Sequence, residues 1–170
     1  MHTLRIETRI AAPCQTCFDL ALDMDFHVQT LRDTGERIVG GCATGRIGPG
    51  ETVTFEGVHF GVRQRFTARI TAYEAPTWFR DEMVQGAFTS FAHDHRFRPT
   101  EGGCVMEDEV RFVAPFGVLG RWVGQHVLRP HLERLLRSRC EAIAREAERR
   151  TRLASVRCED TGRTPVPTRP

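Results

Sequence analysis

The stretch from Phe91 to Phe97 places two histidines on the same strand face as two phenylalanines. Side chains of an extended strand alternate between its faces, so Phe91, His93, His95 and Phe97 share one face. The phenylalanines direct that face toward the core, and the imidazoles are carried inward with them. Core strands seldom hold two titratable rings unless a cavity or polar partners receive them. The pattern therefore indicates a hollow, partly polar interior.

Alternating polarity marks several further strands. Residues 3–11 alternate as a half-buried strand, and Pro13 suits the first turn of a following helix. Residues 24–34 are expected to form a second short helix or a loop, and residues 35–50 an irregular strand with turns. From residue 51 to residue 113, alternating segments separated by turn residues predict a meander of antiparallel strands.

The last third of the chain changes to helical spacing. Its apolar residues form a stripe about thirty residues long, which predicts a long amphipathic helix. Pro130 is expected to kink or restart this helix. His126 and His131 fall on its polar flank, which predicts surface positions for both. Residues 151–170 cannot bury a core and are predicted to be a disordered tail, which leaves residues 1–150 as one domain.

Composition narrows the classes of partner. The 170 residues include 24 basic side chains, all arginine, and 22 acidic ones, so the net charge of +2 gives no electrostatic case for nucleic acid. No apolar run approaches the ~20 residues that span a bilayer, so no stable membrane insertion is expected. Without a secretion signal, a cytoplasmic location with reduced cysteines is expected. Cys14 and Cys17 are interpreted as ordinary helix residues, because no second pair completes a zinc site.

Short motifs accompany this order of elements. They are Ile10-Ala11-Ala12-Pro13 with Phe18 and Asp23, Ile70-Thr71-Ala72-Tyr73 before Pro76, Phe79 to Met83, the histidine strand, Gly103 to Asp108, and Pro115-Phe116-Gly117. Over residues 3–147 the chain resembles the START-like SRPBCC superfamily, specifically its polyketide cyclase/dehydrase-like ligand-binding branch. The resemblance implies an α+β helix-grip fold: a curved antiparallel sheet around a long C-terminal helix, two short helices after the first strand, and a cavity between sheet and helix. It implies fold more strongly than function.

Hairpin geometry brings two aspartates toward the histidines. If the last two strands form a simple hairpin, Asp108 lies opposite His93 and diagonal to His95, and opposed side chains are about 4.5–5.5 Å apart at Cβ. Asp81 comes alongside if its strand turns that face inward. Asp108 could then orient His93 as a general base toward a hydroxyl or an acidic C–H. The alternative is an internal polar cluster in which carboxylates and imidazoles offset each other's desolvation.

A metal site is a further alternative. His93 and His95 could present two ligands from one strand. His59 resembles a third ligand, but at ~4.8 Å per strand it lies roughly 14 Å away, too far for one ion. Asp81 or Asp108 could take its place. We nevertheless expect neither a metal nor an organic cofactor.

The leading functional hypothesis is binding of a hydrophobic small molecule, such as a lipid, a quinone or a polyketide-like aromatic. In it, His93, His95 and Asp108 orient the ligand. The other expected contacts are His59, Asp81, Phe55, Phe66, Ile70, Phe91, Phe97, Val110, Phe112 and, in the core or at the cavity mouth, Trp122.

Two other hypotheses remain open. One is a cofactor-independent polyketide cyclase or dehydratase, with His93 as general base and Asp108 as its orienter. The other is a non-catalytic interaction or stress module whose cavity is filled by its own side chains. An interior void larger than a few waters would argue against this last hypothesis. The sequence leaves the ligand and the oligomeric state open.

Overall fold

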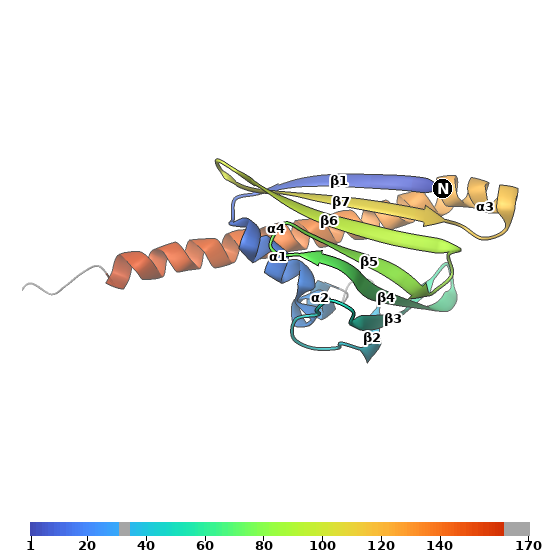
Figure 1. Ribbon diagram of the computed structural model, residues 1–170, viewed down its shortest axis with the longest axis horizontal. Coiled ribbons are helices and arrows are strands. Elements are labelled where there is room, and N and C mark those ends of the chain that lie inside the picture. The colour runs from blue at the N-terminus through green and yellow to red at the C-terminus, as the bar shows by residue number, and fades with distance from the viewer. Residues whose placement is uncertain (31–34, 162–170) are drawn as a thin grey trace, which may run out of the picture.

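The computed structural model describes residues 1–30 and 35–161. Its main element is a seven-stranded antiparallel sheet with the strand order β1-β7-β6-β5-β4-β3-β2. The strands are β1 (His2–Ile10), β2 (Arg37–Gly41), β3 (Thr52–His59), β4 (Val62–Glu74), β5 (Trp78–Gln85), β6 (Ser90–Thr100) and β7 (Gly103–Val113). Figure 1 shows them as one long, curved layer. The predicted meander and the α+β helix-grip fold are confirmed.

Two short helices follow β1, as expected, and a long helical region ends the chain. The short ones are α1 (Cys14–Leu22) and α2 (Met24–Thr30), and the long region comprises α3 (Gly117–Val123), a π-helical segment (Gly124–Leu128) and α4 (Arg129–Thr161). α4 packs against β1 and α1 and runs along the sheet in Figure 1. The predicted restart at Pro130 is confirmed: the π-helical segment ends at Leu128 and α4 begins at Arg129, beside a proline that lacks a backbone N–H.

α4 extends further than the sequence predicted. The expected disordered tail began at residue 151, but the helix continues to Thr161. Near this boundary, Arg149 and Arg150 donate to Glu146 at 2.7 and 2.8 Å. Side-chain pairs three and four residues apart sustain a helix that has no core to bury. Residues 162–170 of the predicted tail lie outside the described residues.

Phe18 of α1 is the centre of the main core. Its side chain is fully buried. Its ring meets those of Tyr73, Phe79 and Phe97 edge-on, with centroids 5.5, 5.6 and 5.4 Å away. Such pairs add packing energy beyond the area they bury. The side chains that α4 adds to this core are Cys140, Ile143 and Ala147.

On the outer face of the sheet, one carboxylate ties together the three strands that carry the histidines and aspartates. Asp94 of β6 is completely buried although it points away from the core. It accepts hydrogen bonds from Trp78 and Arg80 of β5 at 2.9 Å each, and from Arg111 of β7 at 2.8 Å. Charge-assisted bonds of this kind are short and strong, so the backbone behind the inner polar residues is firmly held.

We expect Phe18→Ala to lower the free energy of unfolding by about 3–5 kcal/mol, because it leaves a cavity among three aromatic rings. Urea denaturation followed by circular dichroism measures this change. Phe116→Ala is the matched control, since Phe116 is 84% exposed and its loss should change stability by less than about 0.5 kcal/mol. Equal effects of the two substitutions would contradict this account of the core.

Candidate functional site

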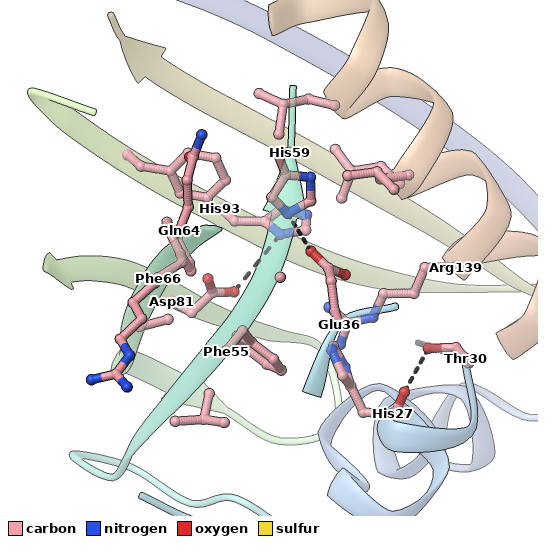
Figure 2. A pocket seen from close by; sticks show the side chains of 18 of the residues that line it. His27, Thr30, Glu36, Phe55, His59, Gln64, Phe66, Asp81, His93 and Arg139 are labelled. Atoms are coloured by element: carbon pink, nitrogen blue, oxygen red, sulfur yellow. Dashed lines mark hydrogen bonds and ion pairs between the residues drawn. The ribbon is translucent and has the colours of Figure 1, made fainter. Parts of the chain in front are cut away.

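A cavity of about 250 Å³ lies between the inner face of the sheet and α4. A water molecule takes up about 30 Å³ in the liquid, so the void exceeds a few waters. Its walls come mainly from β3, β4, β5, β6, α2 and α4. The apolar side chains that line it include Val53, Phe55, Phe66, Ala68, Ile70, Phe79, Phe88, Phe91, Leu132 and Leu136. Figure 2 shows Phe55 and Phe66 beside the polar side chains of Asp81 and His93.

Four polar side chains form a connected cluster on one wall, which we call the His–Asp cluster (Asp81, His93, His95 and Asp108). His93 Nε2 lies 3.0 Å and His95 Nδ1 2.8 Å from the same oxygen, Oδ1 of Asp108. On the other side, Asp81 Oδ2 lies 3.0 Å from His95 Nε2 and 3.8 Å from His93 Nδ1. Each imidazole therefore lies between two carboxylates.

The pairing of β6 with β7 corrects the predicted register. Asp108 lies directly opposite His95, and Val110 lies opposite His93. Thr100 pairs with Gly103 across a two-residue turn, and this fixes every other pair of the hairpin. Asp108 still reaches His93, because diagonal neighbours on one face are within reach of long side chains. Asp81 lies directly opposite His93, so its strand does turn that face inward.

Burial and mutual charge set the protonation of the cluster. His93, His95 and Asp108 are at most 4% exposed. Burial and then the neighbouring His95 lower the pKa of His93, which favours a neutral ring. Burial opposes charge on His95, but hydrogen bonding and attraction to Asp108 and Asp81 outweigh it and raise the pKa of His95. The same contacts hold the pKa of Asp108 far below its usual range despite its burial.

Neighbouring side chains fix the orientation of the cluster. Cys140 of α4 donates its S–H to the second oxygen of Asp108 at 3.3 Å, and burial followed by that carboxylate raises the pKa of the thiol. Phe79 stacks on His95 with ring centroids 4.1 Å apart. Asp81 and His93 reach the cavity wall, while His95 and Asp108 lie behind them. The cluster therefore presents one carboxylate and one imidazole to a ligand.

His27 of α2 is a second polar group on the cavity wall. Its side chain is 7% exposed, and its ring lies against Phe55 with centroids 4.8 Å apart. Burial, then the charge of Arg139, lowers the pKa of His27 well below its usual value, so the ring is neutral. Within the described residues, its Nδ1 has no hydrogen-bond partner. A buried polar atom without a partner costs free energy that a ligand can recover.

A third polar group lies toward the loop after β3. His59 Nε2 pairs with Glu36 at 2.9 Å, as Figure 2 shows, and His59 Nδ1 lies 3.1 Å from His131 Nε2 of α4. The prediction that His131 lies at the surface is wrong, because it lines the cavity. His126 does lie on the outside of the helical region, beside Trp122.

The structure places the other predicted contacts in three environments. Phe55, Phe66, Ile70 and Phe91 line the cavity, together with His59, Asp81 and His93. Phe97, Val110 and Phe112 do not line it; they pack in the cores on either side. Trp122 is 61% exposed and lies away from the cavity, contrary to its predicted place in the core or at the mouth. The π-helical segment rotates the helical register before α4, so the apolar stripe counted from α4 did not place Trp122 correctly.

Sequence reasoning missed His27 and Arg139 as wall residues. Both lie on helices whose apolar faces do not single them out, and neither stands in a strand whose alternation shows its direction. Arg139 donates to the carbonyl of Ala21 in α1 at 3.1 Å and lines the cavity. Only the packing of α2 and α4 around the sheet shows this placement.

Comparison with known proteins identifies the family. A sequence model of the family described as "Polyketide cyclase / dehydrase and lipid transport" matches residues 1–148. The chain belongs to this family. The resemblance to the polyketide cyclase/dehydrase-like branch of the START-like SRPBCC superfamily is thereby confirmed. No curated protein matches the sequence.

Solved structures share the fold of this polyketide cyclase/dehydrase family member at low sequence identity. TTHA0849 from Thermus thermophilus is 20% identical with a TM-score of 0.64, over 84% of this chain and 97% of that one. Major latex-like protein 151 from Panax ginseng is 14% identical with a TM-score of 0.62, over 86% and 97% of the two chains. SA2116 from Staphylococcus aureus is 12% identical with a TM-score of 0.67, over 89% and 96%. These identities establish the fold alone.

Among the residues described, no helix combines the length and apolar character that crossing a bilayer requires.

We expect Asp108→Ala to lower the free energy of unfolding by about 3–5 kcal/mol, because it strips two buried imidazoles of their shared acceptor. Asp108→Asn should cost less, since the amide oxygen still accepts a hydrogen bond. Glu107→Ala is the control on the same strand: its partner Arg98 is exposed, and the expected loss is below about 1 kcal/mol. Chemical denaturation measures all three. If Asp108→Ala unfolded at the same denaturant midpoint as the wild type, the proposed dependence of stability on this carboxylate would be contradicted.

Proposed function

We propose that the protein binds a hydrophobic small molecule with one or two rings and a polar group in the cavity between the sheet and α4. The observation that carries this proposal is an apolar void of about 250 Å³ whose wall also holds the unpartnered Nδ1 of His27. Ligand sites are typically apolar cavities with a few placed polar groups. Membership of a family described by cyclases and lipid transport supports the same class of ligand.

The volume of the cavity favours a compact ligand. An apolar cavity of ~150 Å³ holds benzene, so scaling by volume gives roughly ten non-hydrogen atoms here. That size corresponds to a fused bicyclic aromatic such as a naphthol. The void also argues against a module filled by its own side chains, because a filled interior would leave no such space.

The polar wall favours a ligand with a hydroxyl or carbonyl group. A neutral imidazole nitrogen without a partner can donate to a carbonyl or accept from a hydroxyl, depending on its tautomer. Arg139 lines the cavity near His27 and favours an oxygen that carries partial negative charge. The ligand's ring would then rest on Phe55 and Phe66, which lie on facing positions of β3 and β4.

Fluorescence titration with 2-naphthol tests occupancy of the cavity. Ala68→Phe should weaken binding by more than about tenfold, because the added ring fills space that the ligand needs. Thr71→Phe adds the same ring on the exposed side of β4 and should leave the affinity unchanged. Wild-type affinity in a folded Ala68→Phe variant would place the naphthol elsewhere and sink the proposal.

A second titration tests the role of His27 as the hydrogen-bonding partner. In His27→Phe, the affinity ratio of 2-naphthol to naphthalene should fall by about 2–12-fold, which corresponds to a net hydrogen bond of ~0.5–1.5 kcal/mol. Naphthalene serves as the internal control, because it fills the same space without a hydroxyl. An unchanged ratio would show that the hydroxyl contacts some other group.

A second candidate function is a cofactor-independent cyclase or dehydratase. It is favoured by one contact: His93 reaches the cavity while Asp108 holds its Nε2 at 3.0 Å. His93 could accept a proton from an acidic C–H or a hydroxyl of the ligand, with Asp108 as a positioning residue. Turnover of aromatic polyketide substrates by wild type and His93→Ala tests it. Binding without any conversion by the wild type would eliminate the enzyme hypothesis.

We also propose a cytoplasmic location. In that reducing compartment the described cysteines would remain thiols. These are Cys14, Cys17, Cys42, Cys104 and Cys140.

A further inference from the structure

We propose that Asp81, His93 and His95 form a binding site for one divalent first-row transition metal ion, such as Zn²⁺. Ligand atoms of these three side chains all lie within 4.8 Å of one another. Asp81 comes from β5, and both histidines come from β6, so the site rests on two adjacent strands. The sequence left a metal as an alternative, with Asp81 or Asp108 in place of the distant His59, although none was expected; the observed spacing favours Asp81 as the third ligand.

The atomic spacing matches the requirements of a metal. Asp81 Oδ2 lies 3.0 Å from His95 Nε2 and 3.8 Å from His93 Nδ1. Around an ion with bonds of ~2.0–2.1 Å, ligand atoms of a tetrahedron are roughly 3.3 Å apart. These two separations bracket this value, and the two ring nitrogens lie within 4.8 Å of each other, so side-chain rotations that draw the two rings together would complete the site. Two imidazoles and one carboxylate leave further coordination positions open, as in catalytic rather than structural sites.

The opposite ring nitrogens are held as metal-binding histidines require. A ligating imidazole usually donates its other N–H to a carboxylate, which fixes the tautomer and the ring orientation. Here His93 Nε2 and His95 Nδ1 both lie within 3.0 Å of Oδ1 of Asp108. Cys140 holds the second oxygen of that carboxylate. Asp108 thus leaves the inward nitrogens of both rings directed at Asp81.

Access and charge also suit a cation. Asp81 and His93 line the cavity, so an ion bound there would have its open positions toward the space proposed for the ligand. Asp81 and Asp108 bring two formal negative charges into a buried region, and these charges attract a divalent ion. The nitrogen–oxygen donor set favours ions such as Zn²⁺ or Co²⁺ over Mg²⁺, which prefers oxygen ligands.

Titration of metal-stripped, full-length protein with Co²⁺, followed by visible absorption and Zn²⁺ displacement, tests this site without any organic ligand. We expect one equivalent per chain, and no displacement by Mg²⁺. Asp81→Asn should weaken Zn²⁺ binding by more than about 100-fold. Asp108→Asn should weaken it by ~10–100-fold with the stoichiometry unchanged, as for other outer partners of ligating histidines. His126→Asn, on the helix surface, should bind as wild type does.

Several results would overturn the proposal. No stoichiometric binding by the wild type would do so, as would wild-type affinity in a folded Asp81→Asn variant. X-ray absorption of the Zn²⁺-loaded wild type covers the case in which that variant fails to fold. It should show nitrogen and oxygen ligands; sulfur ligands would instead place the ion at the thiols of Cys14 and Cys104, which lie 2.6 Å apart.

Since 2-naphthol binding is measured separately, the metal site and the proposed ligand binding can each fail alone. A bound metal would occupy Nδ1 of His93 and so exclude it as a free base.

Discussion

One carboxylate oxygen of Asp108 holds both imidazoles of β6, and the inner wall of the protein depends on this contact. Two rings with centroids 3.7 Å apart would be costly to bury without it. Asp108 reaches them because β7 pairs with β6 and places Asp108 directly opposite His95. Cys140 of α4 donates a hydrogen bond to the other carboxylate oxygen of Asp108. The cluster therefore links the sheet to the helix that the sheet grips, and it fixes which ring atoms face the cavity.

The apolar part of the cavity depends on a different feature, the separation of two cores. Phe18 centres a packed aromatic core at one end, and Phe112 belongs to a smaller cluster with Leu4 and Val110 at the other. The cavity borders both cores, where side chains of β3 and β4 face α4 without filling the space. The packed cores beside it keep the cavity open, because close-packed interiors have low compressibility. A polar wall beside an open apolar space is what a small ligand with one polar group requires.

Much of this arrangement could be predicted from the sequence. Strict alternation from Phe91 to Phe97 indicated the inward histidines, because one face of a strand must be buried as a unit. The pairing of neighbouring strands also predicted that Asp81 and Asp108 lie near these histidines. The exact register of the hairpin could not be predicted, because it depends on which residues form the turn. The observed turn places Asp108 opposite His95 instead of His93. Side-chain reach made that error harmless for the contact itself.

The helices were the harder part of the site. Alternation does not apply to them, and polar residues on a helix flank can turn inward when a sheet wraps around the helix. His131 of α4 lines the cavity for this reason, and His27 reaches the cavity from α2. The π-helical segment also interrupts the α-helical periodicity. A regular period therefore predicted Trp122 on the inner face, whereas its side chain is exposed.

Native mass spectrometry of the chain purified from its own host tests the central claim, an interior built to hold a small molecule beside the His–Asp cluster. The account predicts one bound organic molecule per chain, of a size near a bicyclic aromatic, which is released when the protein unfolds. It also predicts loss of that mass in Ala68→Phe but not in Thr71→Phe. A bound molecule retained equally by both folded variants would show that the ligand lies outside the cavity and would contradict the account.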